Sequence, residues 1–178
     1  MAVEPNLKNV RLLEASRRLN GFEWVNVVQV AAGRNVGILV LNATDSNGTT
    51  SEVPEALGNL MRSETVASVP LDILIPPERK IDFIKLDIEG AEYNALVGLQ
   101  QTIGRCRPII VSEYSPGLIF EISGVQGAEY LRWLIEHGYR LGVIEKDGTI
   151  SEAGVDYEIV MAIHRNRGTD HIDIIAQP

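Results

Sequence analysis

The sequence predicts an α/β fold with a mostly parallel sheet. Apolar runs and helix-like stretches alternate along most of its 178 residues, which is typical of a sheet with helices on its faces. Two runs typical of buried strands, residues 81–87 and 108–114, are each followed by a helical pattern. At 178 residues we expect a single domain, because this length supports one core.

The elements of the first half follow from turn and helix-end signals. Pro5 and Asn6 suit a helix start, and Asn20-Gly21 suits a helix end. Runs rich in β-branched residues predict strands, whereas Ser, Asn, Gly and Thr predict a surface loop. The expected order is a helix over residues 6–19, strands over 25–31 and 36–42, a loop over 43–52, and a strand within 64–74 that Pro70 places at an edge or bulge.

The second half has stronger patterns. Leu96, Leu99 and Ile103 share one face of a predicted helix, and Gly138 ends another. The expected order is a strand over residues 81–87, a helix over 91–103, a strand over 108–114, a helix over 126–137, and an antiparallel pair of strands formed from 139–150 and 156–165. Residues 169–178 are expected to form a tail.

Composition excludes several classes of function. A net charge of −8 argues against binding to nucleic acid or to an anionic membrane, because a phosphate-rich partner would be repelled. The single Cys106 closes no internal disulfide, and no apolar run is long enough for a membrane span, so we expect a cytoplasmic protein. His164 and His171 lack metal-ligand spacing, so no metal site is predicted.

Acidic residues follow the predicted strands. Because ligands of open parallel sheets bind beyond the carboxyl ends of the strands, these side chains are candidate site residues. Asp87 and Glu89 are candidates for orienting a substrate hydroxyl or accepting its proton, and Glu92 is expected to stabilise a helix start. Glu113 is either a further catalytic candidate or half of a surface ion pair. Glu4 suits a ribose ligand, with a solvated loop acid as the alternative.

One block of the chain resembles a known family. "IDFIKLDIEGAEYNALVGLQ" is similar to the signature "IDFIKIDVEGAE..vL.G" of the FkbM-type methyltransferases that use S-adenosylmethionine. Weaker similarities follow in the family's order, among them "AVEPNLKNVRLLEASRRLNG", "VPLDIL", "RPIIVSEY" and "IVMAIHR". Together they cover nearly all of residues 2–165.

The resemblance implies a Rossmann-like class I methyltransferase fold. It also implies transfer of a methyl group from S-adenosylmethionine to a hydroxyl of a small-molecule acceptor, such as a sugar or a secondary metabolite. By this resemblance the cofactor would be bound by Glu4, Asn6, Ala31, Ala32 and Asp87. The catalytic residues would be Asp87, Glu89 and Glu113.

The chain departs from the family pattern at its start. The family's glycine-rich block "vDvGAN.G", with its strand and helix, has no counterpart before Glu4. We therefore expect a sheet lacking its first strand and helix, with exposed edges that favour a homo-oligomer. Two alternatives stay open, namely a noncatalytic methyltransferase-like module that binds a protein partner, and a domain for another adenosine cofactor such as NAD.

Overall fold

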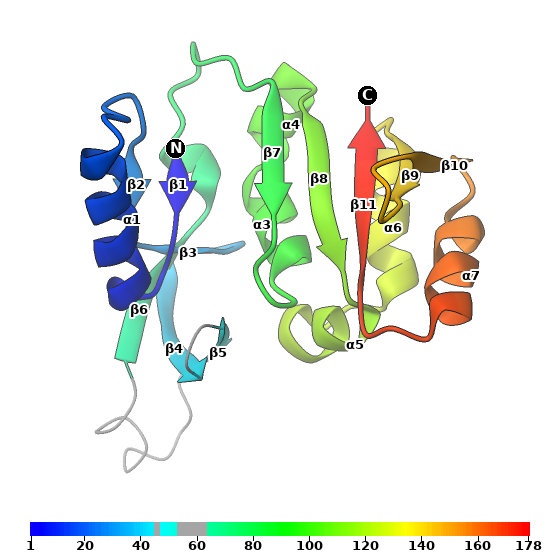
Figure 1. Cartoon of the computed structure of the whole chain (residues 1–178), viewed down its shortest axis with the longest axis horizontal. Helices are drawn as coiled ribbons and strands as arrows, with labels where there is room; N and C mark the ends of the chain where they lie inside the picture. Colours follow the sequence, from blue (N-terminus) through cyan, green and yellow to red (C-terminus); the bar gives the residue numbers. More distant parts are fainter. Residues whose placement is uncertain (45–46, 53–63) are drawn as a thin grey trace.

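A computed structural model describes residues 1–44, 47–52 and 64–178, and it has a mixed α/β fold. The strands form three sheets with the orders β1-β2, β3-β6-β4-β5 and β10-β9-β11-β8-β7. Figure 1 shows the β1-β2 pair beside the five-stranded sheet, with β7 as the strand of that sheet nearest to β1. Within the described ranges, every helix is too short or too polar to traverse a lipid bilayer.

The N-terminal layer contains the predicted first helix. Helix α1 spans Leu7–Leu19, and the side chain of its N-cap residue Asn6 accepts a hydrogen bond from the Lys8 amide at 2.8 Å. Strands β1 (Ala2–Val3) and β2 (Val27–Val28) pair in parallel. The prediction for residues 6–19 is therefore confirmed, because local capping signals were sufficient to set both ends of the helix.

The predicted strand over residues 25–31 is divided between two sheets. After β2 the chain bends, with the Val30 amide bonded to the Val28 carbonyl at 3.2 Å, and β3 (Ala31–Ala32) joins β6 (Glu64–Val69). Strand β6 lies between β3 and β4 (Gly37–Thr44), and Pro70 follows its last residue. Only Ser68 and Val69 pair with β3, so residues 64–67 of β6 have β4 as a neighbour on one side only. Part of the strand therefore lies at an edge, as expected, but it is not the part next to Pro70.

The loop predicted over residues 43–52 is largely a strand. β5 (Asn47–Glu52) pairs antiparallel with β4 from Leu39↔Glu52 to Thr44↔Asn47. Its polar composition resembles that of a loop, but backbone hydrogen bonds to a neighbouring strand do not depend on apolar side chains. Residues 45–46 of the predicted loop lie outside the described residues.

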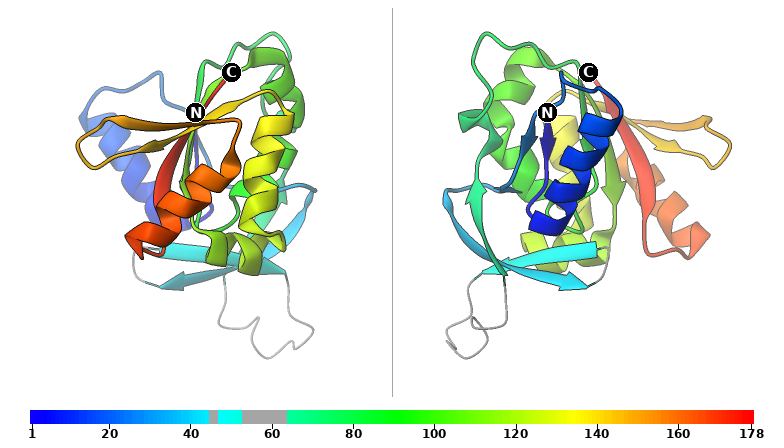
Figure 2. Two further views of the ribbon diagram at one scale, coloured as in Figure 1. Left: turned by 90° about the vertical axis from the view of Figure 1, so that its right-hand side faces the viewer. Right: turned by 60° about the vertical axis from the view of Figure 1, so that its left-hand side comes forward.

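The five-stranded sheet contains one parallel pair of neighbours and three antiparallel pairs. β7 (Phe83–Leu86) and β8 (Ile109–Tyr114) are parallel, as their connecting helices require. β11 (Ile172–Gln177) is antiparallel to both β8 and β9 (Arg140–Ile144), and β10 (Ile150–Gly154) is antiparallel to β9. The predicted mostly parallel sheet is thus not confirmed in this part of the molecule. Figure 2 shows the turn of the β9–β10 hairpin projecting outward, while α7 packs against both of its strands.

Two predictions near the C-terminus were wrong. Residues 156–165, expected as a strand, belong to helix α7 (Tyr157–Arg167), whose N-cap Asp156 accepts the Glu158 amide. Residues 169–178, expected as a tail, contain β11 in the interior of the sheet. A short run rich in β-branched residues fits a strand or a helix, and the Asp156 cap with Gly168 as the stop favours the helix.

The remaining helices cover the C-terminal sheet and form the main core with it. The predicted helix over 91–103 is two helices, α3 (Glu92–Gly98) and α4 (Gln100–Cys106). The others are η1 (Leu71–Ile73), α5 (Pro116–Leu118), the π-helix η2 (Ile119–Ser123) and α6 (Gly127–Glu136). Fully buried side chains include Leu96, Ile103, Ile110, Tyr130, Leu134 and Leu141. In contrast, α1 contributes no buried residue.

Candidate functional site

A cavity of about 520 Å³ lies between β1 and β7. Both strands run in the same direction, so their carboxyl ends lie at the same edge of the fold (Figure 1). In the described part of the chain, β1 pairs only with β2 and β7 only with β8, so the edges that face the cavity are unpaired. The cavity therefore separates two strands that could each accept a further parallel neighbour.

The cavity has an apolar body and a polar rim. The body is formed by apolar side chains of β1, η1, β7 and α3–α4, including Val3, Leu71, Ile75, Ile84, Leu86 and Leu99. The rim lies where β1 and β7 end, and it contains Glu4, Asn6, Asp87 and Glu89. Ala31 and Ala32 of β3 also line the cavity. All five residues expected to bind the cofactor, together with the catalytic candidate Glu89, thus line one hollow.

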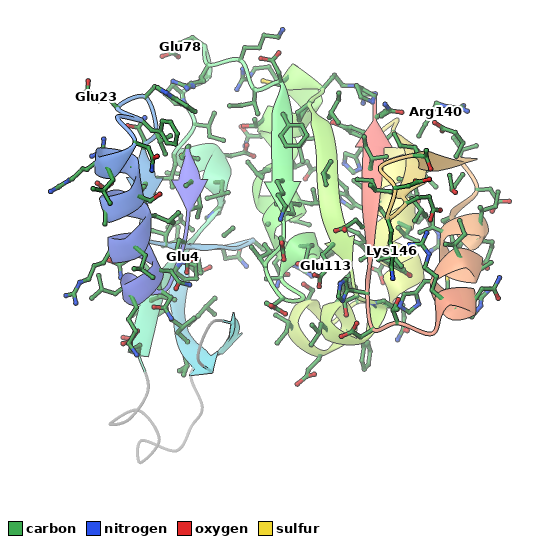
Figure 3. The ribbon with its side chains drawn as sticks, viewed as in Figure 1. Glu4, Glu23, Glu78, Glu113, Arg140 and Lys146 are labelled. Carbon is green, nitrogen blue, oxygen red and sulfur yellow. The ribbon has the colours of Figure 1, made fainter. Side chains whose placement is uncertain are left out.

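Glu4 lies directly after β1, at the polar rim. Its Oε1 accepts the Asn6 amide at 2.7 Å, which fixes the turn between β1 and α1. Figure 3 shows Glu4 and Glu113 at a similar height in the view, whereas Glu23 lies near the top. Asn6 itself is buried, and its Oδ1 is used to cap α1. The structure therefore gives Asn6 a definite structural role in addition to its place in the cavity wall.

The turn between β7 and α3, residues 87–90, carries the two central acids. Asp87 is half-exposed and forms an ion pair with Lys85, with Nζ and Oδ2 2.5 Å apart. Glu89 has a backbone φ of 55°, in the left-handed region that side chains other than glycine rarely adopt. Such strain persists only where the surrounding structure enforces it, and it is common at functional sites.

Gly90 completes this turn with a φ of 93°. A Cβ on this residue would lie 2.4 Å from the carbonyl oxygen of Leu118, so only glycine allows the close approach of α5. The Ser123 hydroxyl donates to the Gly90 carbonyl at 2.6 Å. Residues near α5 and η2 therefore hold the turn from the side opposite β7.

Glu92 is the carboxylate whose environment the sequence interpretation missed. Its side chain is only 1% exposed, Oε1 accepts the Ile88 amide at 2.9 Å, and the buried Oε2 has no hydrogen-bond partner among the described residues. Burial raises the pKa of Glu92 from 4.5 to about 7, although the bond from Ile88 opposes this shift. The only signal in the sequence was that a third acid lies beside a buried strand end.

Glu113 lies near the end of β8 and is not among the residues that line the cavity. Burial raises its pKa, with smaller contributions from Asp87 and Glu89, while His171 opposes the shift. These contributions place Glu113 in the electrostatic environment of the turn acids. Among the described residues, Glu113 forms no ion pair with a lysine or arginine, which was the structural alternative for it.

The described residues contain no cluster of three or more His, Cys, Asp or Glu side chains suited to a metal ion. The polar rim instead offers carboxylates beside an apolar wall, at the carboxyl ends of two strands. This arrangement is a candidate ligand site of an α/β fold, at the carboxyl ends of two strands.

Comparison with known proteins gives the family. The "Methyltransferase FkbM domain" profile matches residues 1–141, and the chain belongs to this FkbM methyltransferase family. The fold is also similar to the crystal structure of methyltransferase FkbM from Methylobacillus flagellatus KT, with a TM-score of 0.54 and 18% sequence identity over 97% of the present chain. The match covers 35% of that longer chain. A search of curated proteins gives no match.

Proposed function

We propose that the chain forms part of a methyltransferase that uses S-adenosylmethionine and methylates a hydroxyl of a small molecule, such as a sugar or a secondary metabolite. The observation that supports this proposal is the shared cavity. Glu4, Asn6, Ala31, Ala32 and Asp87 come from three separate parts of the sequence, and all line it.

The residues of the cavity fit the chemical groups of this cofactor. The Glu4 carboxylate follows a strand end, where it would accept hydrogen bonds from ribose hydroxyls. The small side chains of Ala31 and Ala32 would leave space for a flat aromatic base. Asp87 and Glu89 are negatively charged acceptors, and their charge would favour a sulfonium nearby.

The cofactor supplies a methyl group that is already activated for transfer. The protein then has to orient the acceptor hydroxyl and remove its proton. Asp87 and Glu89 lie at the cavity rim and would orient that hydroxyl. Glu113 does not line the cavity, so it would accept the proton through water, and its raised pKa makes it a stronger base than an ordinary carboxylate.

We further propose that residues 1–178 belong to a single methyltransferase-like domain. In this domain an additional extended segment would complete the sheet between β1 and β7. The Ala2 and Glu4 amides bond to the carbonyls of Asn26 and Val28, so by alternation the Val3 backbone faces the cavity. On the other side the Asp82 carbonyl bonds to β8, which leaves the Phe83 and Lys85 backbone groups facing the cavity. These groups would pair with a parallel strand whose apolar side chains fill the body of the cavity.

Calorimetric titration with S-adenosylhomocysteine tests this function. We expect binding to the chain extended by a strand and a glycine-rich turn of the family type, and weaker binding to the unextended chain. Glu4→Gln should weaken binding about tenfold or more, because it removes a charged acceptor while retaining an oxygen for the Asn6 amide. Glu23→Gln is the matched control, since Glu23 is exposed and lies near the top of the view in Figure 3. Absence of heat with both forms of the chain would contradict the proposal.

The unpaired edges favour a second candidate, a noncatalytic module that associates with a second copy of the chain. Helix α1 adds exposed apolar surface, with Leu12 69% and Leu19 87% exposed. This candidate predicts a dimer with no affinity for S-adenosylhomocysteine. Size-exclusion chromatography with light scattering checks it, and a monomer at all concentrations would exclude it.

A further inference from the structure

The turn between β7 and α3 depends on a buried carboxyl that the proposed chemistry does not use. Glu92 is not among the residues lining the cavity, and its Oε1 reaches back to the amide of Ile88 at 2.9 Å. Ile88 stands between Asp87 and Glu89 in the chain. One hydrogen bond to its backbone therefore constrains both acids.

The geometry of Glu92 differs from ordinary helix capping. A cap accepts hydrogen bonds from amides in the first turn of its own helix, or reaches back to the N-cap amide. Here the N-cap residue is Ala91, and the bond goes to Ile88, three residues before it and outside α3. The bond therefore supports the preceding turn and not the helix end.

The turn needs such support because its conformation is unfavourable. Glu89 has a φ of 55°, and a residue other than glycine pays a conformational cost there. Ser123 and Leu118 hold Gly90 at one end of the turn. Two hydrogen bonds hold the backbone immediately before Glu89. The Ile88 amide donates to Glu92 at 2.9 Å, and the Ile88 carbonyl accepts the Ala91 amide at the longer distance of 3.3 Å.

We propose that Glu92 is a positioning residue, whose carboxyl holds the Ile88 amide and thereby keeps Asp87 and Glu89 directed at the cavity. This inference rests on the proposed methyltransferase function. The titratable groups that bear on Glu92 are Glu113 of β8 and the buried Tyr130 of α6, whose hydroxyl donates to Ser112 at 2.6 Å. Neither supplies a positive charge, so the ionised carboxylate of Glu92 is stabilised mainly by backbone amides.

The Ile88 amide reports on this role directly, with no cofactor present. In NMR measurements we expect this amide to exchange with solvent about tenfold or more faster in Glu92→Ala than in the unmodified chain, because its acceptor is lost. Glu92→Gln retains a carbonyl oxygen and should restore most of the protection. Glu121→Gln, at an exposed acid of η2, is the control and should leave the exchange unchanged.

The Ile88 amide also shows whether its acceptor, the Glu92 carboxyl, gains or loses a proton as the pH changes. The Ile88 resonance of the unmodified chain is expected to shift with pH, with a midpoint near 7, and to lose that midpoint in Glu92→Gln. If Glu92→Ala does not fold, the pH titration of the Ile88 amide alone tests whether Glu92 holds that amide. Equal Ile88 exchange in a folded Glu92→Ala variant, or an unchanged titration in Glu92→Gln, would overturn the proposal.

Measurements of S-adenosylhomocysteine binding test whether the turn over residues 87–90 affects the proposed cofactor site. The affinity of the extended chain for S-adenosylhomocysteine should change between pH 6 and pH 8, and Glu92→Gln should remove the part of that change centred near 7. Unchanged pH dependence in Glu92→Gln would restrict Glu92 to a structural role and overturn its positioning role. If the unmodified chain binds no S-adenosylhomocysteine, the proposed function fails, whereas the Ile88 measurements still decide whether Glu92 holds the turn.

Discussion

Replacing Gly90 by alanine is expected to lower the free energy of unfolding by about 2 to 5 kcal/mol. Two costs add: the left-handed φ of 93°, at about 1 to 2 kcal/mol, and the overlap of a Cβ with the Leu118 carbonyl oxygen at 2.4 Å, at about 1 to 3 kcal/mol. Neither atom can move alone, because the Cβ is fixed in place by the backbone of residue 90 and the oxygen belongs to the backbone of Leu118. Urea denaturation followed by circular dichroism measures the loss.

Gly124→Ala is the matched control for this change. Gly124 also has a left-handed φ, of 71°, but an added Cβ would meet no atom within 4 Å. Its replacement should therefore cost only about 1 kcal/mol, as expected for the backbone conformation alone. Equal losses for the two variants would show that the contact between the turn and Leu118 does not constrain Gly90.

Glu92→Gln is expected to remove a large pH dependence of stability. The pKa of Glu92 is raised from 4.5 to about 7 in the fold, so the folded state binds a proton more tightly than the unfolded chain does. The stability contributed by the protonated group is thus fully present below pH 4.5 and is lost as the pH rises to about 7. At about 1.4 kcal/mol per pKa unit, the loss is about 3 kcal/mol.

Urea unfolding at pH 5 and at pH 8 measures this effect. The unmodified chain should lose about 2.5 kcal/mol more than Glu92→Gln over this interval, because part of the stabilisation is already lost at pH 5. Glu121→Gln changes an exposed acid and should keep the full pH dependence. The same change in the free energy of unfolding between pH 5 and pH 8 in the unmodified chain and in Glu92→Gln would show that the Glu92 carboxyl does not titrate in the folded state near neutral pH.

Local signals predicted several elements well. The helix over residues 6–19 has its N-cap at Asn6 and its end near Asn20, and the strand predicted over 108–114 is β8 (Ile109–Tyr114). The acids that follow the predicted strand over 81–87 lie at the end of β7, beside a cavity. In these places hydrogen-bonding side chains and apolar periodicity act over a few residues, so they can be recognised in the sequence.

Other assignments depended on partners that are distant in the chain. β5 is polar but is stabilised by backbone pairing with β4, and β11 lies in the interior of the sheet because β8 and β9 both pair with it. Residues 156–165 could suit either a strand or a helix, and the observed helix α7 packs on α6 and β9. Short ambiguous segments adopt the conformation that pairs or buries them best.

The amino-acid sequence determined the family, the strand–acid–helix block around Asp87 and Glu89, and the capped helices, since each depends on residues that are close together in the chain. The fold decided that Glu4, Ala31 and Asp87 line one cavity, and that Glu92 is a buried acid holding the Ile88 amide. Burial and the meeting of separate strands are properties of the packed chain. They set the pKa of a carboxyl and the direction of a side chain, and neighbouring residues in the sequence do not specify them.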